Sequence, residues 1–122
     1  MQIKRSIPIF RIFDEAKARE FYLDYLGFNV DWEDKPEDTP IYMQVSRGGL
    51  VLHLSEHFGD CCPGSHIFVA MDRQFVETYY AELSAKDYKY QRPGLEAAPW
   101  SEMTFDVTDP FGNRISFNAM ND

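Results

Sequence analysis

Two histidines are the residues of this chain whose type and position are best suited to chemistry. His53 lies within the apolar run Leu50–Ser55, and His66 opens a second run, His66–Met71, so both are expected on strands with buried neighbours. A neutral imidazole is a common ligand of divalent transition metals, and together the two could supply half of a metal site. Taken singly, each is more readily explained as a hydrogen-bonded histidine of a pocket or core.

No established catalytic motif accompanies these histidines. The sequence has no phosphate-binding glycine loop, no Gly-x-Ser-x-Gly turn, no Cys-x-x-Cys and no His-Glu-x-x-His. Its two cysteines, Cys61 and Cys62, are adjacent, so a disulfide between them would close a strained ring and join no distant segments. We expect free thiols in a reducing compartment, with a redox role as the alternative.

Charge and composition limit the partners. The chain has 122 residues and a formal net charge of −8, which repels nucleic acid and anionic membranes and favours a neutral or cationic ligand; the alternative is that the charge serves only solubility. Hydrophobic residues make up 44% and aromatic residues 16%, enough for one folded core. No apolar stretch reaches the length of a signal peptide or a membrane span, so a cytoplasmic location is expected.

The elements that must position these residues form a pattern that occurs twice. In the first half, Asp14 is expected to cap a helix that ends at Gly27, and a glycine pair permits a tight hairpin. In the second half, Asp72 is expected to cap the helix and Asp109–Asn113 to form the hairpin turn. The expected strands are Ile3–Phe13, Phe28–Trp32, Ile41–Ser46 and Leu50–Ser55, then His66–Met71, Tyr88–Gln91, Met103–Thr108 and Arg114–Ala119, with residues 92–101 as a loop.

This repetition predicts an α+β fold of two tandem βαβββ modules whose sheets enclose a small-molecule cavity. We expect a single domain over residues 1–122, with one module at about residues 1–57, a connector at 58–65 and the second module at about 66–122. The alternative is a coincidence of strand and helix propensities, because βα patterns are common.

Two segments of the sequence resemble a known family. The run Ile7–Asp14 with the following Ala16-x-Ala18-x-x-Phe21-Tyr22-x-x-x-Leu26-Gly27-Phe28 is similar to the first strand and helix of the glyoxalase, bleomycin-resistance and dioxygenase (vicinal oxygen chelate) superfamily. The run Asp109–Phe117 resembles that superfamily's final hairpin, Asp-Pro-x-Gly-Asn and a strand. The resemblance implies paired βαβββ modules in a homodimer, often with an exchanged N-terminal strand and two crevices at the interface.

The enzymes of that superfamily hold a divalent metal with four side chains, and only part of this set is present here. The corresponding positions are approximately Ile7, His53, His66 and Ser116. Ile7 offers no ligand atom and Ser116 replaces a carboxylate, so the set is incomplete and an extradiol-type iron site fails. A site of two histidines completed by water or by Glu56 is the alternative.

The metal-free, bleomycin-resistance branch matches in more detail. Pro99–Trp100 resembles a Pro-Trp pair whose indole lines the drug crevice, and Tyr42 falls where that crevice has an aromatic residue. Aromatic faces bind flat cations by stacking and cation–π attraction, although these residues and Trp32 could be ordinary packing residues. The resemblance therefore implies a protein without a catalytic group or cofactor that sequesters an aromatic, cationic antibiotic. The expected ligand-binding residues are Trp100, Tyr42, Trp32, His53, His66 and Ser116.

Two other functions stay open. One is a metal-dependent lyase, isomerase or dioxygenase in which His53 and His66 hold a divalent ion and the substrate chelates it through vicinal oxygens. The other is a binding protein of unknown metabolite specificity on the same scaffold.

Overall fold

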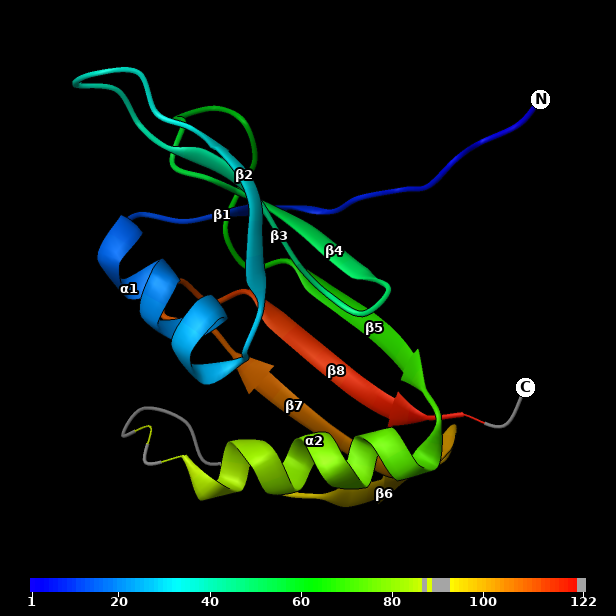
Figure 1. Ribbon diagram of the computed structural model, residues 1–122. Coiled ribbons are helices and arrows are strands. Elements are labelled where there is room, and N and C mark those ends of the chain that lie inside the picture. The colour runs from blue at the N-terminus through cyan, green and yellow to red at the C-terminus, as the bar shows by residue number, and fades with distance from the viewer. Residues whose placement is uncertain (87, 89–92, 121–122) are drawn as a thin grey trace. The chain divides into compact units, whose positions relative to one another are not determined.

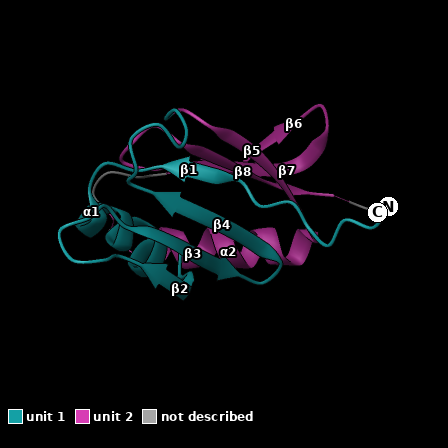
Figure 2. Cartoon of the chain, turned by 90° about the horizontal axis from the view of Figure 1, so that it is seen from above, with its two compact units in different colours: residues 1–63 teal, residues 64–122 magenta. Residues whose placement is uncertain are grey.

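The computed structural model describes residues 1–86, 88 and 93–120, and it divides the chain into two compact units, residues 1–63 and residues 64–122 (Figure 2). Each unit contains one four-stranded sheet and one helical segment. No helix in the described part of the chain is long and apolar enough to cross a membrane.

Unit 1 has the element order βαβββ (Figure 1). Its sheet has the strand order β1-β4-β3-β2, in which β1 pairs in parallel with β4 and the remaining pairs are antiparallel. The elements are β1 (Ile9–Arg11), α1 (Glu15–Arg19), η1 (Glu20–Tyr25), β2 (Asn29–Asp34), β3 (Tyr42–Arg47) and β4 (Leu50–Ser55).

Unit 2 repeats that order, so the predicted fold class of two βαβββ modules is confirmed (Figure 1). Its sheet has the equivalent strand order β5-β8-β7-β6, and β5 pairs in parallel with β8. The elements are β5 (His66–Met71), α2 (Arg73–Ala85), β6 (Glu96–Ala98), β7 (Ser101–Thr108) and β8 (Arg114–Ala119).

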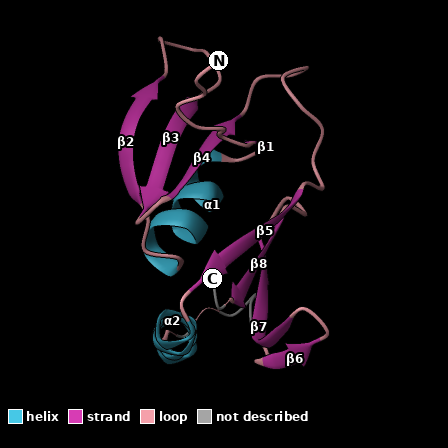
Figure 3. Cartoon of the chain, turned by 90° about the vertical axis from the view of Figure 1, so that its right-hand side faces the viewer, coloured by secondary structure: helices cyan, strands magenta, loops and turns pink. Residues whose placement is uncertain are grey.

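The first helix begins where the sequence predicted. The Asp14 carboxylate accepts a hydrogen bond from the Lys17 amide at 3.0 Å and so caps the first turn. The second half of this helical segment, η1, is wider than an α-helix, because the Leu26 amide donates to the Phe21 carbonyl, five residues back, at 2.9 Å. Figure 3 shows this segment on one side of the β2–β4 sheet. The buried side chains are Ala18, Phe21, Tyr22, Tyr25 and Leu26 from the helix and Met43, Val45, Leu52 and Leu54 from the sheet.

The second helix packs on β7 and β8. The ring of Tyr79 lies edge-on to Phe105 and Phe117, with centroids 6.1 and 5.1 Å apart. Val76 and Leu83, on the same side of α2, are also buried. An apolar stripe of helical period thus covers one face of the sheet, as its sequence predicts.

The bounds of β2, β3 and β7 differ from the prediction by one or two residues, and larger differences lie at β1 and in the segment before β7. β1 is much shorter than Ile3–Phe13, because its pairing with β4 covers only Ile9–Arg11 and residues 1–6 are exposed. Of the strand expected at Tyr88–Gln91, Tyr88 belongs to no helix or strand. Residues 89–91 lie outside the described residues. Instead β6 forms at Glu96–Ala98, in the expected loop. Its sequence carries no strand signal, so its pairing with the edge of β7 accounts for it.

Candidate functional site

Unit 1 presents a polar and aromatic sheet face opposite its buried face. Tyr42 and Gln44 on β3 alternate with buried Met43, and His53 on β4 alternates with buried Leu52. In the strand register Gln44 lies directly beside His53. The alternation along β4 therefore places His53 on the face opposite the buried one, beside Tyr42 and Gln44 of β3.

Three of the predicted site residues form one cluster on this face. The Trp32 ring stacks on Tyr42 with a centroid distance of 5.9 Å and an interplanar angle of 11°. His53 lies edge-on to both rings, at 5.2 Å from each. Trp32 remains 44% exposed, so the outer side of this stack is available to a ligand.

A directed chain of hydrogen bonds runs through the cluster to Asp31. The Gln44 amide nitrogen donates to the Asp31 carboxylate at 3.0 Å, which orients the amide so that its oxygen faces His53 Nε2 at 3.0 Å. Because that oxygen only accepts, Nε2 carries a proton, and in the neutral ring Nδ1 accepts from the Tyr42 hydroxyl at 2.7 Å. These contacts therefore hold the neutral ring of His53 in one tautomer.

The protonation equilibria of both rings agree with this arrangement. Burial, and secondarily the charge of Arg5, lowers the pKa of His53 below its ordinary value of 6.5. Burial is also the main cause that raises the pKa of Tyr42, with Asp60 and Cys61 adding to it. At neutral pH the cluster thus consists of a neutral imidazole and a neutral phenol.

Acid is expected to destabilise the protein partly through His53. In the unfolded chain this histidine has its ordinary pKa of 6.5, so as the pH falls the unfolded state binds the proton first. The stability contributed by the neutral ring is fully present above 6.5 and is lost as the pH falls from there through the lowered folded pKa. Urea denaturation at stepped pH should show a steeper loss for wild type than for His53→Gln, and parallel curves would contradict this assignment.

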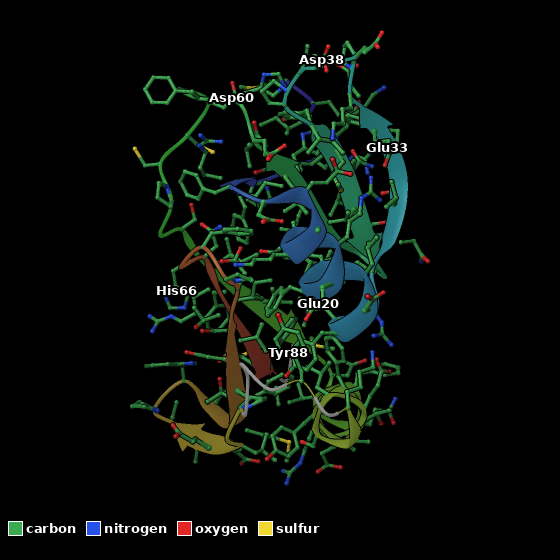
Figure 4. The ribbon with its side chains drawn as sticks, turned by 90° about the vertical axis from the view of Figure 1, so that its left-hand side faces the viewer. Glu20, Glu33, Asp38, Asp60, His66 and Tyr88 are labelled. Carbon is green, nitrogen blue, oxygen red and sulfur yellow. The ribbon has the colours of Figure 1, made fainter. Side chains whose placement is uncertain are left out.

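The other three predicted residues line a cavity of about 410 Å³ in unit 2. His66 projects from the start of β5 (Figure 4), and its Nε2 lies 2.7 Å from the Ser116 hydroxyl. The Arg114 guanidinium lies 3.0 Å from His66 Nδ1, and Arg114 also faces the Asp106 carboxylate at 3.8 Å. The lining residues are His66, Gly94, Glu96, Ala98, Trp100, Thr104, Phe105, Asp106, Arg114 and Ser116.

Trp100 is an exposed ring held in a fixed position. It is 59% exposed, yet its indole N–H donates to the Asn118 side-chain oxygen at 2.9 Å. The same oxygen accepts from the Thr104 hydroxyl at 2.8 Å, and the Asn118 amide nitrogen donates to the carbonyls of Val69 and Ser116 at 3.3 and 3.1 Å. Trp100 also forms part of the wall of a second cavity, of about 500 Å³.

The structure reveals site residues that the sequence analysis did not single out. Asp31 was missed because strict alternation along β2 would place it opposite Trp32, and only a bulge brings both to one face. Asn118 was missed although a buried amide in the apolar run Ile115–Ala119 is itself a signal of a required hydrogen-bond network.

The candidate metal ligands do not fit a metal centre. Both ring nitrogens of His53 and of His66 already have hydrogen-bonding partners, and a guanidinium beside His66 opposes a second cation there. Glu56, the possible additional ligand, accepts from the Ile41 amide at 3.2 Å. Within the described residues there is no group of three or more His, Cys, Asp or Glu side chains placed to hold a metal ion.

The two βαβββ units, with their equivalent strand orders, define a fold that known proteins share. The family model of the glyoxalase superfamily proteins matches residues 1–122. The chain therefore belongs to this superfamily, as predicted. No curated protein matches the chain.

Solved structures with the same fold include binding proteins and a metal-containing protein. A glyoxalase/bleomycin resistance protein from a Streptomyces species is 25% identical, covering 93% of this chain and 99% of its own, with a TM-score of 0.64. The bleomycin-binding protein of Streptomyces verticillus, complexed with copper(II)-bleomycin, is 24% identical, covering 99% of each chain, with a TM-score of 0.71. A variant of the fosfomycin resistance protein FosX from Listeria monocytogenes, complexed with Mn(II), is 13% identical, covering 99% of this chain and 95% of its own, with a TM-score of 0.69.

Proposed function

We propose that this protein binds and sequesters a flat, cationic, aromatic small molecule of the bleomycin type without altering it. The observation that carries the proposal is Trp100, whose indole plane is largely exposed but fixed by a fully buried asparagine. A ring held in this way beside a cavity loses little conformational entropy when a ligand stacks on it. An unanchored surface tryptophan would have to be ordered by the ligand.

The charge of the protein and its fold relatives support the same class of ligand. A net charge of −8 attracts a cationic molecule, and Glu96 adds a carboxylate to the cavity wall that holds Trp100, whereas the carboxylate of Asp106 faces the Arg114 guanidinium at 3.8 Å. The bleomycin-binding protein of Streptomyces verticillus, which has the same fold, is complexed with copper(II)-bleomycin. We further propose that the protein acts in the cytoplasm as a homodimer with two equivalent crevices, without nucleic-acid or membrane partners.

The proposal is tested with two variants that each leave one tryptophan, because the chain has only two. Calorimetric titration with metal-free and copper(II)-bleomycin gives the affinity, and the fluorescence of Trp32→Phe and Trp100→Phe shows which ring the drug approaches. Trp100→Ala is expected to weaken binding by at least about tenfold, the effect of removing a stacking anchor.

Two results would overturn this function. One is the absence of saturable binding of either form of the drug to wild type. The other is a stoichiometric metal in protein purified without chelator that is lost in His53→Ala, which would indicate the metal-dependent class. Size-exclusion chromatography with light scattering separately tests the dimer.

A further inference from the structure

The bulge in β2 brings a carboxylate onto the aromatic face of unit 1. Asn29 pairs with Ser46 and Val30 with Val45, but the next paired residue of β2 is Trp32, so Asp31 has no partner on β3. Its carboxylate nevertheless accepts hydrogen bonds from Gln44 at 3.0 Å and from the Ser46 hydroxyl at 2.9 Å. The side chains of Asp31 and Trp32, although adjacent in sequence, therefore both lie on the aromatic face of unit 1.

The carboxylate of Asp31 is held in place by hydrogen bonds and forms no ion pair with a described residue. The hydrogen bonds from Gln44 and then Ser46 lower its pKa, with a smaller effect from the charge of Arg5. Both of its donors are neutral, and no described Lys or Arg forms an ion pair with it. By contrast, Glu33 on the same strand pairs with Arg19 at 2.5 Å.

The neighbouring groups present oxygen acceptors beside this charge. The Tyr42 proton is committed to His53 and the Ser46 proton to Asp31, so the oxygens of Tyr42 and Asp31 are left to accept from a ligand. The stacked ring of Trp32 adds an electron-rich plane, which attracts a cation. A planar cation with N–H donors matches all three features, whereas an anion matches none of them.

We propose that Asp31 is an anionic subsite on the aromatic face of unit 1 and pairs with an amidinium, guanidinium or protonated heteroaromatic group of a ligand stacked on Trp32. This inference rests on the proposed function, because it assigns the residue that selects the cationic part of such a ligand. It adds a specificity-determining residue to the aromatic cluster.

The test uses small probes that differ in charge and share their shape: benzamidine, a planar aromatic cation, and benzamide, its neutral counterpart. Binding is followed in the Trp100→Phe protein by the fluorescence of Trp32 and by chemical shifts of the aromatic cluster. Asp31→Asn keeps an oxygen that can accept from Gln44 but removes the charge. Glu20→Gln is the charge-matched control, because Glu20 lies on η1 (Figure 4), is exposed and forms no ion pair with a described residue.

Asp31→Asn is expected to weaken benzamidine binding by about fivefold or more and to change benzamide binding by less than about twofold. Glu20→Gln should leave both affinities unchanged. The inference is overturned if benzamidine does not bind, if both probes lose affinity equally in Asp31→Asn, or if the two variants behave alike. Matching urea denaturation curves for the two variants show that folding does not account for the difference.

Failure of this inference is distinguishable from failure of the proposed function. The function fails if wild type does not bind bleomycin, whatever the small probes do. The subsite fails on the benzamidine series even when bleomycin binds.

Discussion

Replacing Asn118 with alanine is expected to lower the free energy of unfolding by about 3 kcal/mol and to weaken ligand binding at Trp100 by about tenfold. The Asn118 side chain is fully buried, and it makes hydrogen bonds to the Trp100 indole, the Thr104 hydroxyl and two backbone carbonyls. Truncation leaves the Thr104 hydroxyl without its acceptor in a buried position. It also releases the indole, so the ring must be ordered at the expense of binding energy.

The matched control is Thr104→Val, which removes one donor to Asn118 but leaves the Trp100 hydrogen bond in place. We expect a loss of about 1 kcal/mol in stability and unchanged affinity for the ligand. Urea denaturation and calorimetric titration of both variants separate the two effects. Bleomycin binding by Asn118→Ala as tight as that of wild type would contradict the anchoring role of Asn118.

The duplicated fold could be predicted because each half carries its own local signals. Strand alternation, an aspartate before each helix and a turn in each hairpin recur in the same order, and the β4, β5 and β8 bounds agree with the structure. The strand register shows the same correspondence: Ile9 lies beside His53 in unit 1, as Phe68 lies beside Ser116 in unit 2. His53 and Ser116 lie four residues beyond Gly49 and Gly112 in the sequence, so a local pattern alone indicates that they are equivalent.

The side-chain networks could not be predicted because the two halves use equivalent positions differently. Two residues beyond His53 and Ser116 lie Ser55 and Asn118, both fully buried. Ser55 donates to Asp60 at 2.6 Å in the loop that follows β4, whereas Asn118 fixes Trp100. Which loop a buried polar group holds depends on contacts distant in sequence, and strand periodicity carries no information about them.

The bulge at Asp31 shows the same limit within one strand. The sequence Val30-Asp31-Trp32 alternates as a regular strand would, so nothing local marks the inserted residue. The aromatic members of the face could be predicted from residue type and resemblance, but the carboxylate beside them could not. In this chain the sequence indicates the apolar and aromatic surfaces better than the charges that give them specificity.

Replacing Asp109 with alanine is expected to lower the free energy of unfolding by about 3 kcal/mol. The buried Asp109 carboxylate accepts from the amides of Phe111 and Asn113, both at 2.8 Å, and from the Asn113 side chain at 2.9 Å. Asn113 in turn accepts from the amides of Gly64 and Ser65, both at 3.2 Å. Loss of the carboxylate therefore loosens the turn and also the start of β5, which carries His66.

A second substitution distinguishes the carboxylate from mere polarity at this position. Asp109→Asn keeps one oxygen for the two backbone amides but turns an N–H₂ group toward the Asn113 amide nitrogen, where two donors then face each other. We expect an intermediate loss of about 1 to 2 kcal/mol, against less than about 1 kcal/mol for the exposed neighbour in Pro110→Ala. Urea denaturation gives the order of the three variants. Because Gly112 has a φ of +93°, the turn already requires glycine at one position, and equal stability of Asp109→Ala and Pro110→Ala would mean that this backbone preference alone closes the hairpin.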